Sequence, residues 1–398
     1  MISFEEAYEK VMENTFSFGV EKTLLTHSRG RVLAEDVLAD RDSPPFNRST
    51  KDGITINYKA IEDGQKAFKI EGVIAAGTAK TQLKDSANCL EIMTGAVLPD
   101  NADTVVMYED IEINDGVATL KKEVVKGQNI HRQGSDVKQG EVIIKKNTKI
   151  TAAEIGILAS VGKVEVSVKE LPKITLISTG NELVAVHEKP LPHQIRGSNT
   201  LSLHALLETE NIHAEHLHLD DEKESIKNNL RELFGENDVL MLSGGVSRGK
   251  FDYIPEVLDE LGVEKVFHKV KQRPGKPFWF GLHKASKTII FSFPGNPVST
   301  FANYHVYFKD WLYKAMEIPA ESKSAILMNE VENDSPLTLF VRVKLKTEAE
   351  KLHAFLISEN GSGDLSSLAH TDGFIRLSPD KKKYEKGTVV PCILSRYN

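Results

Sequence analysis

The chain has 398 residues, of which 40% are hydrophobic and 27% charged, so its composition is that of an ordinary globular protein with about two to four domains. Its formal net charge of −7 argues against a general nucleic-acid-binding protein, which normally carries a basic excess. The two cysteines, Cys89 and Cys392, are too far apart in sequence to indicate a disulfide framework or a metal-ligand spacing. Each is expected to be a small buried hydrophobe.

The N-terminal segment predicts an amphipathic helix over residues 3–15, with a capping box formed by Ser3 and Glu6. The same segment lacks the basic start and apolar core of a signal peptide. No run of about 18 apolar residues predicts a transmembrane helix. A cytoplasmic location is therefore expected, with neither membrane nor nucleic acid as a partner.

The pattern of elements changes along the chain. Short strand-like runs between Gly, Asn and Asp turns predict β structure from about residue 44 to 140. A helix over 151–162, closed by a glycine, and a strand over 164–170 follow. From residue 172 to about 316, apolar strands alternate with helices, ending in a strand, a tight turn and a helix over 287–308. This alternation is typical of an α/β domain with a parallel sheet. The remaining residues return to short strands and predict a small β domain.

Three glycine-containing loops follow apolar strands in the α/β region: "STGNEL" (178–183), "SGGVSRGKFDY" (243–253) and "FPGNPVS" (293–299). Backbone N–H groups in such loops, with the dipole of the following helix, favour an anion. One such loop is also typical of an ordinary strand–helix turn, and none matches a Walker A or dinucleotide fingerprint. Together they indicate a phosphate-bearing ligand. The expected lining residues are Ser178, Thr179, Gly180, Ser243, Gly244, Gly245, Ser247, Pro294, Gly295, Asn296 and Pro297.

Three carboxylates lie close to these loops in sequence: Glu182, Asp221 and Asp252. Taken singly, each is more often an N-cap or a solvated charge. Together they suit a magnesium ion that bridges a phosphate and is held by one or two carboxylates plus water. No Ser–His–Asp or Cys–His pattern in the sequence indicates a covalent nucleophile.

The segment "QRPGKPFWFG" (272–281) places Arg273 and Lys276 directly before prolines. Each proline fixes its own φ and restricts the residue before it, and Gly275 can take a left-handed turn. A stiff backbone around two cations suits an anion pocket. A Pro-Gly turn whose charges face water has the same pattern, so the segment alone leaves both interpretations open.

The N-terminal region has three turn-rich stretches: "PPFNRSTKDG" (44–53), "EIMTGAVLPDNADTVVMYED" (91–110) and "HRQGSDVKQGE" (131–141). Each, considered alone, is more typical of a turn than of a site. His131 has no carboxylate or cysteine at metal-ligand spacing, so it is not expected to bind a metal.

Six of these segments, the first two turn-rich stretches and the four in the α/β region, occur in the order and spacing of a known family. They resemble the molybdopterin molybdenumtransferases, which include bacterial MoeA and the E domain of gephyrin. The resemblance runs from about residue 3 to the C-terminus. It implies a transferase of molybdenum cofactor biosynthesis that inserts molybdenum from molybdate into adenylylated molybdopterin, with magnesium-dependent release of AMP.

The resemblance also implies a fold of four domains. The first is a discontinuous N-terminal domain of residues 1–43 and 141–171, and the second is a β-rich insert of residues 44–140. The third, residues 172–316, is a three-layer α/β domain with a mostly parallel sheet, similar to the molybdopterin adenylyltransferases. The fourth, residues 317–398, is a C-terminal β-barrel-like domain. The family is dimeric, and the α/β domain of one subunit faces the insert of the other.

The family's functional positions can be carried over residue by residue. Asp52, Thr94 and Asp136 match catalytic positions of the insert, and Asp221 and Asp252 match catalytic positions of the α/β domain. Glu182, together with these last two, matches the acidic positions that hold magnesium.

The molybdate pocket of the family has counterparts in two domains. Arg273 and Lys276 match its cationic pair. Arg342 and Ser362 fall where the C-terminal domain contributes to the pocket.

The chain departs from the family pattern at several loop positions. Asn47 and Arg48 stand where bacterial members often carry Asp and Asn. Arg248 and Lys250 stand where smaller or acidic residues are common, and two extra cations there suit a more strongly anionic ligand or solvent. The acidic residue that often precedes Asn199 is absent.

Two alternatives to molybdenum insertion remain. One is the adenylyl transfer itself, which needs only the α/β module, so the extra domains argue against it. The other is a gephyrin-like scaffold without turnover, although no appended linker or partner domain indicates one. A molybdopterin adenylyltransferase is a further expected partner. Molybdate and tungstate have nearly equal size and charge, so the sequence does not distinguish them.

Overall fold

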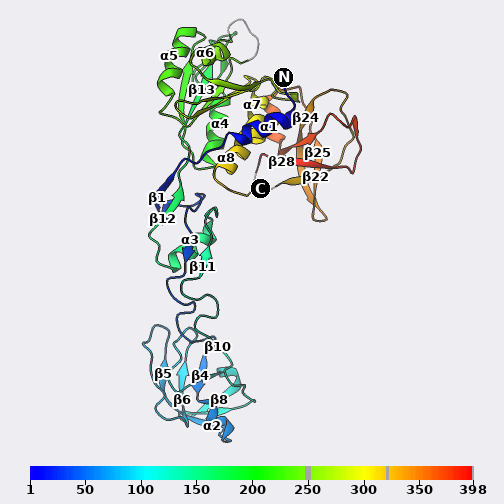
Figure 1. Cartoon of the computed structure of the whole chain (residues 1–398). Helices are drawn as coiled ribbons and strands as arrows, with labels where there is room; N and C mark the ends of the chain where they lie inside the picture. The colour runs from blue at the N-terminus through cyan, green and yellow to red at the C-terminus, as the bar shows by residue number, and fades with distance from the viewer. Residues whose placement is uncertain (247–251, 320–321, 397–398) are drawn as a thin grey trace. The chain divides into compact units, whose positions relative to one another are not determined.

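The computed structural model of the chain describes residues 1–246, 252–319 and 322–396 (Figure 1). The chain divides into two units. Unit 1 comprises Met1–Lys22, Gly30–Ala34 and Ser167–Asn398, and unit 2 comprises Thr23–Arg29 and Glu35–Val166. Residues of the N-terminal segment therefore fall in both units. The predicted first domain, residues 1–43 and 141–171, has residues in both units, and the four predicted domain boundaries stay predictions.

A six-stranded sheet forms the centre of unit 1. Its strands, in spatial order, are β16 (Glu215–Leu219), β13 (Ile174–Thr179), β17 (Val239–Ser243), β21 (Thr288–Phe293), β20 (Trp279–His283) and β18 (Glu264–His268). The first four strands run parallel, and β20 and β18 add an antiparallel edge. The parallel strands are the continuous apolar runs of the sequence, because helices cover both of their faces. The prediction of a mostly parallel sheet is confirmed.

Helices pack on both faces of this sheet. They are α1 (Phe4–Glu13), α4 (Asn199–Glu208), α5 (Lys223–Leu233), α6 (Ile254–Glu260), α7 (Pro297–Asn303) and α8 (Lys309–Ala315). Successive strand residues point to opposite faces. Leu176 therefore joins the core that contains α1, α4, α7 and α8, whereas Ile177 joins the core that contains α5 and α6. The three-layer prediction is confirmed, and Ser3 forms the predicted capping box with Glu6 at the start of α1.

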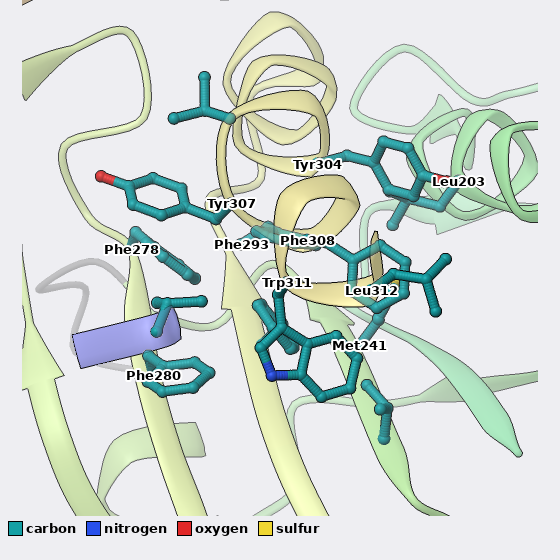
Figure 2. Close-up of a cluster of buried hydrophobic side chains, with 14 of the residues drawn as sticks. Leu203, Met241, Phe278, Phe280, Phe293, Tyr304, Tyr307, Phe308, Trp311 and Leu312 are labelled. Carbon is teal, nitrogen blue, oxygen red and sulfur yellow. The ribbon is translucent and has the colours of Figure 1, made fainter. Parts of the chain in front are cut away.

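Aromatic side chains fill the core between the sheet and the α7–α8 helix pair (Figure 2). Phe278 packs on Tyr307 with ring centroids 4.8 Å apart, and Phe308 packs on Trp311 at 5.5 Å. Tyr307 and Phe308 belong to η3 (Tyr304–Phe308), a π-helical segment that joins α7 to α8. The sequence predicted a helix here but not its π segment, because the 3.6-residue pattern of apolar positions continues through it.

Five strands of the C-terminal part close a barrel. They are β22 (Lys323–Leu327), β24 (Thr338–Glu348), β25 (Lys351–Leu356), β26 (Gly373–Leu377) and β28 (Val389–Leu394). β24 pairs with both β25 and β26, which completes the ring and removes free sheet edges from it. The two-residue strand β19 (Gln272–Arg273) adds to β24 in parallel. The predicted barrel-like C-terminal domain is therefore confirmed.

The main sheet of unit 2 is the predicted β-rich insert. Its strands, in spatial order, are β7 (Thr104–Met107), β4 (Gly53–Ile56), β6 (Asn88–Ile92), β5 (Ala67–Ile74), β9 (Val117–Leu120) and β8 (Ile111–Asn114). Cys89 is buried in this part and Cys392 in the barrel, and both are free, as predicted.

Short elements complete the chain. They are β1 (Val20–Leu24), η1 (Leu25–His27), β2 (Val37–Leu38), β3 (Arg48–Ser49), α2 (Tyr58–Glu62), η2 (Tyr108–Asp110), β10 (Ile130–His131), β11 (Val142–Ile144), α3 (Ala152–Ser160), β12 (Glu165–Lys169), β14 (Leu183–Val184), β15 (Ile195–Arg196), β23 (Val331–Glu332), η4 (Leu365–His370) and β27 (Lys383–Tyr384). Within the three described ranges, no helix has both the length and the apolar character needed to cross a membrane.

Candidate active site

Three glycine-containing loops begin at one edge of the α/β sheet. In the register of the parallel strands, Ser178 of β13 is level with Ser243 of β17, and Ser243 is level with Phe293 of β21. The loops that follow these residues therefore start beside one another, as expected for the carboxyl ends of neighbouring parallel strands. Gly244 N–H donates to the Phe293 carbonyl at 3.2 Å and ties the second loop to the third.

The two glycines of the second loop lie against Thr179. A Cβ atom at Gly244 would stand 2.8 Å from the Thr179 carbonyl oxygen, and one at Gly245 would stand 2.9 Å from Thr179 Oγ1. Both glycines also have positive φ, 103° and 67°, so this loop requires glycine twice. Thr179 Oγ1 is buried and has no hydrogen-bond partner within the described part of the chain. A ligand in the loops is one explanation for such an orphaned group.

Asn199 joins the second and third loops. Its Nδ2 donates to Ser243 Oγ at 2.8 Å and to the Gly295 carbonyl at 2.7 Å. Asn199 is the first residue of α4, so the positive end of that helix dipole lies beside both loops. Sequence patterns did not indicate this contact, because it links residues 44 and 96 positions apart.

A group of carboxylates lies beside the first loop. Asp221 N–H donates to Asn181 Oδ1 at 3.1 Å, and Asn181 N–H donates to Asp221 Oδ2 at 3.4 Å. Burial raises the pKa of Asp221, the bond from Asn181 lowers it, and the nearby charges of Glu182, Asp252 and Asp220 raise it again. Glu182 and Asp252, the other two predicted metal carboxylates, are thus near enough to Asp221 to raise its pKa. Asp220 is a fourth member that the sequence did not single out.

Magnesium fits this group of carboxylates in charge and in donor type. Burial is the largest cause of the raised pKa of Asp221, and a cation would offset the smaller part that comes from the neighbouring carboxylates. In the described ranges, no group of three or more His, Cys, Asp or Glu side chains is arranged to hold a metal. Mg²⁺ commonly uses one or two carboxylates and takes its other ligands from water and phosphate, so it needs no such protein cage. The magnesium assignment stays a prediction.

Residues 272–276 connect the sheet of the barrel to the α/β sheet. The first two of them form β19 beside the barrel strand β24, and the chain then continues into β20 of the α/β sheet. Gly275 has a φ of 87°, and a Cβ there would stand 2.3 Å from Asn303 Oδ1. The turn is therefore fixed by strands at both ends and by glycine in its middle. Arg273 and Lys276 are both exposed.

Lys276 lines a cavity of about 660 Å³ whose other lining residues are Met1, Lys265, His268 and Lys269. No carboxylate is among these residues, so the cavity favours an anion. His268 Nε2 lies 2.9 Å from the carbonyl oxygen of Val246 in the second glycine loop. The cavity is thus linked to the loops expected to hold phosphate.

The sequence missed the other cations of this cavity. A signal for them exists, because residues 264–276, "EKVFHKVKQRPGK", are strongly basic within a chain of net charge −7. Arg273, Arg342 and Ser362 are not among the residues that line the cavity, so the structure does not place all four predicted molybdate residues in one cavity.

Ser362 lies beside the third glycine loop. Its Oγ accepts from Asn296 Nδ2 at 2.9 Å, and its carbonyl oxygen accepts from Val298 N–H at 3.2 Å. Two residues predicted for different ligands, Ser362 for molybdate and Asn296 for the pterin, are therefore in direct contact.

Arg342 is buried and holds the loop that presents Ser362. Its guanidinium donates to the Gly361 carbonyl at 3.0 Å and to the side chains of Glu359 and Ser367. The guanidinium of Arg342, which was predicted to contribute to the molybdate pocket, is thus paired with the carboxylate of Glu359. The structure gives Arg342 a loop-holding role, and its contact with molybdate stays a prediction.

In unit 2, Asp52 and Thr94 come from separate turn-rich stretches and are in direct contact. Asp52 Oδ1 accepts from Thr94 N–H at 2.6 Å and from Thr94 Oγ1 at 2.9 Å. These two bonds lower the pKa of Asp52, so the carboxylate stays charged. The next residue must be Gly53, because a Cβ there would stand 2.0 Å from the Val106 carbonyl oxygen.

Asp136 belongs to a different hydrogen-bonded chain of unit 2. His131 Nδ1 lies 3.3 Å from Arg48 Nη2, and His131 Nε2 lies 2.8 Å from Asp136 Oδ1. Arginine only donates, so Nδ1 accepts and Nε2 carries the proton that it donates to Asp136. Arg48 and His131 face each other across the β3–β10 pair. The family departure at Arg48 therefore sets the tautomer of a histidine that holds a predicted catalytic residue.

Ser247, predicted to bind the pterin, and the substituted residues Arg248 and Lys250 lie outside the described residues.

Three family models together match most of the chain. Residues 2–162 match the MoeA N-terminal region (domain I and II). Residues 175–314 match a probable molybdopterin binding domain. Residues 324–395 match the MoeA C-terminal region (domain IV).

Full-length relatives agree with these matches. The chain is 38% identical over 395 residues to molybdopterin molybdenumtransferase of Synechocystis, covering 98% of this chain and 99% of that one. It is 31% identical over 412 residues to the enzyme of the same name from Staphylococcus epidermidis, covering 100% and 96%. The crystal structure of the molybdopterin biosynthesis MoeA protein from Pyrococcus horikosii superposes with a TM-score of 0.84 at 28% identity and covers 100% of both chains. The chain therefore belongs to the MoeA family, whose curated members carry the name molybdopterin molybdenumtransferase.

Proposed function

We propose that this chain inserts molybdenum from molybdate into adenylylated molybdopterin, with magnesium-dependent release of AMP. Relatives that carry the name molybdopterin molybdenumtransferase match over nearly their whole length, which supports the assignment. The structural observation that supports it best is the arrangement at one sheet edge. Three glycine loops, two of them joined by Asn199, lie beside a group of carboxylates.

Each part of this edge has a proposed task. The glycine loops hold the phosphates of the nucleotide-linked pterin, since their N–H groups and the α4 dipole favour an anion. Glu182, Asp221 and Asp252 would hold magnesium, which would supply charge compensation at the phosphoanhydride. Arg273 and Lys276 attract molybdate, and the stiff turn between them limits the entropy lost on binding. The protein contributes positioning and electrostatic stabilisation rather than a covalent nucleophile.

We further propose that the chain works as a cytoplasmic homodimer with shared sites. In this assembly Asp52, Thr94 and Asp136 of one subunit complete the site on the α/β domain of the other. The charged Asp52 and the oriented His131–Asp136 pair support a role at a site rather than in a core, because these carboxylates are exposed.

An assay with defined components tests the proposal against its alternatives. The purified protein is incubated with adenylylated molybdopterin and magnesium, with and without molybdate. AMP release that requires molybdate is the expected result. Consumption of ATP with molybdopterin would instead indicate an adenylyltransferase, and the absence of both activities would leave a scaffold.

A further inference from the structure

Three buried polar side chains hold the turn that carries the two exposed cations. Gln272 Nε2 donates to Asn303 Oδ1 at 2.8 Å and to the Pro274 carbonyl at 2.9 Å. Tyr307 Oη donates to Gln272 Oε1. Gln272, Asn303 and Tyr307 each have 0% exposed surface. A fully buried polar network of this kind is costly unless every member is satisfied, so its geometry is strongly constrained.

From this network we propose that Gln272, Asn303 and Tyr307 are positioning residues, which fix where Arg273 and Lys276 stand when an oxyanion binds. The oxyanion in this statement rests on the proposed function, whereas the positioning of the turn does not. None of the three residues needs to touch a ligand, because they act through the backbone at residues 273–276.

The fold gives each bond a defined direction. Burial, with a smaller effect of Glu5, raises the pKa of Tyr307 well above its ordinary value, so the hydroxyl keeps its proton and donates. Gln272 Oε1 is then the acceptor, and its NH₂ group serves Asn303 and Pro274. Asn303 lies so close to Gly275 that no side chain fits between them. The network therefore restricts the backbone of the turn and requires glycine at position 275.

The helix that carries this network also begins at the third glycine loop. α7 follows Asn296, which bonds Ser362 at 2.9 Å, and α7 ends at Asn303 next to the π segment that contains Tyr307. π segments are rare and are frequently found at functional sites. One helix thus contacts the glycine loop, Ser362 and the cationic turn, so a shift of the helix changes all three together.

The test compares Tyr307→Phe with Tyr304→Phe. Tyr304 lies on the same π segment and is 1% exposed, and Figure 2 shows its ring on the other side of the helix from Tyr307. The first measurement is hydrogen exchange of peptides that cover residues 268–278, without any ligand. Faster exchange is expected in Tyr307→Phe only, because Gln272 Oε1 loses its donor and the turn loosens.

The second measurement is the molybdate dependence of AMP release. Tyr307→Phe is expected to raise the half-saturating molybdate concentration about 10-fold, the cost of one buried unsatisfied acceptor. The maximal rate at saturating molybdate stays within about 2-fold, whereas simple loss of folded protein would lower that rate and leave the half-saturating concentration unchanged. Gln272→Met, which keeps the length of the side chain, is expected to have a larger effect in the same direction.

The outcomes separate the two proposals. Unchanged exchange in Tyr307→Phe and Gln272→Met overturns the positioning role, whatever the enzyme does. Faster exchange with unchanged molybdate dependence also overturns it, because the turn would then move without consequence for the oxyanion. A wild-type protein whose AMP release ignores molybdate refutes the proposed function instead, and the exchange measurement still decides whether the network holds the turn.

Discussion

Asp221 has a raised pKa because it is partly buried and shares its surroundings with Glu182, Asp252 and Asp220. The folded chain therefore binds a proton at Asp221 more tightly than the unfolded chain does. This favours folding below the unfolded pKa, and the contribution is lost as the pH rises through the raised folded pKa. At neutral pH the ionised group carries an electrostatic cost, and the proposed magnesium ion would offset the part of that cost that comes from the neighbouring carboxylates.

Asp221→Asn should separate stability from activity. Magnesium-dependent AMP release is expected to fall at least about 10-fold, since a charge that holds the metal is lost. Without magnesium at pH 7 the variant is expected to melt at a higher temperature than wild type, and this gain should vanish at acid pH, where the wild-type carboxyl is protonated. Thermal unfolding at several pH values checks this, with the exposed Glu236→Gln as control. A variant that melts lower at pH 7 would contradict the electrostatic interpretation.

Asp252→Asn tests the same group of carboxylates at a residue of the second loop. Turnover is expected to fall by a factor of at least about 10, with the loss partly recovered at higher magnesium concentrations. A magnesium titration that overlays the wild-type curve would remove Asp252 from the site.

Arg48→Ala should allow His131 to adopt either neutral tautomer. Without the donor at Nδ1, the imidazole proton is free to move there, and Asp136 then loses its hydrogen bond. A loss of one such bond predicts about 10-fold lower turnover. Nitrogen NMR of the imidazole measures the tautomer directly, and Arg132→Ala removes an equal charge from a neighbouring position as control. Unchanged imidazole signals in Arg48→Ala would show that Arg48 does not set the tautomer.

At the scale of elements, the turn at residues 272–276 sets the positions of Arg273 and Lys276. β19 pairs with the barrel strand β24, and β20 belongs to the α/β sheet, so the turn connects two different sheets. The prolines restrict the turn, but its position comes from strand pairing at both ends and from the Gln272 network. Stiff local sequence and tertiary anchoring therefore act together.

Lys276→Ala should raise the molybdate concentration needed for half-maximal rate. Because the side chain is exposed, the expected cost is at the lower end for a charged pair, about 2 kcal/mol or roughly 30-fold. Tungstate should lose affinity in parallel, and binding of adenylylated molybdopterin should change far less. Normal molybdate dependence combined with lost pterin binding would make the residue a phosphate contact instead. Arg273→Lys keeps the charge and removes the fork, so it separates charge from directed hydrogen bonding.

At the scale of the whole molecule, the predicted site residues fall in two units of one chain. Asp52, Thr94 and Asp136 belong to unit 2, and the loops with their carboxylates belong to unit 1. In the proposed homodimer, each site takes one of these two sets from one subunit and the other set from the second subunit.

Mixed dimers test that assignment. Asp52→Ala and Asp252→Ala proteins should each be inactive, and an equal, fully exchanged mixture should recover roughly a quarter of wild-type activity. Half of the dimers are then mixed, and one of the two sites in each mixed dimer is intact. A mixture that remains inactive after proven subunit exchange would place both aspartates in the site of a single chain.

The sequence by itself indicated most element types and named the candidate residues of the site. Apolar runs identified the parallel strands, Ser3 and Glu6 identified the first helix cap, and glycine after three strands identified the loops. These features depend on local backbone preference and on periodic burial, and both can be recognised from a short stretch of sequence. The order of the motifs was specific enough to indicate the family.

Only the tertiary structure decided how those residues meet. Asn199 bridging two loops, Arg342 turned toward Glu359, and Gln272 bonded to Tyr307 all join residues far apart in sequence. Lys265 and Lys269 line the same cavity as Lys276, and the local sequence pattern did not predict that they would do so. Such contacts depend on the register of strands and on which helix face is buried, and many sequences with the same local pattern differ in both. The sequence could therefore propose candidate site residues, whereas their hydrogen-bond partners required the folded chain.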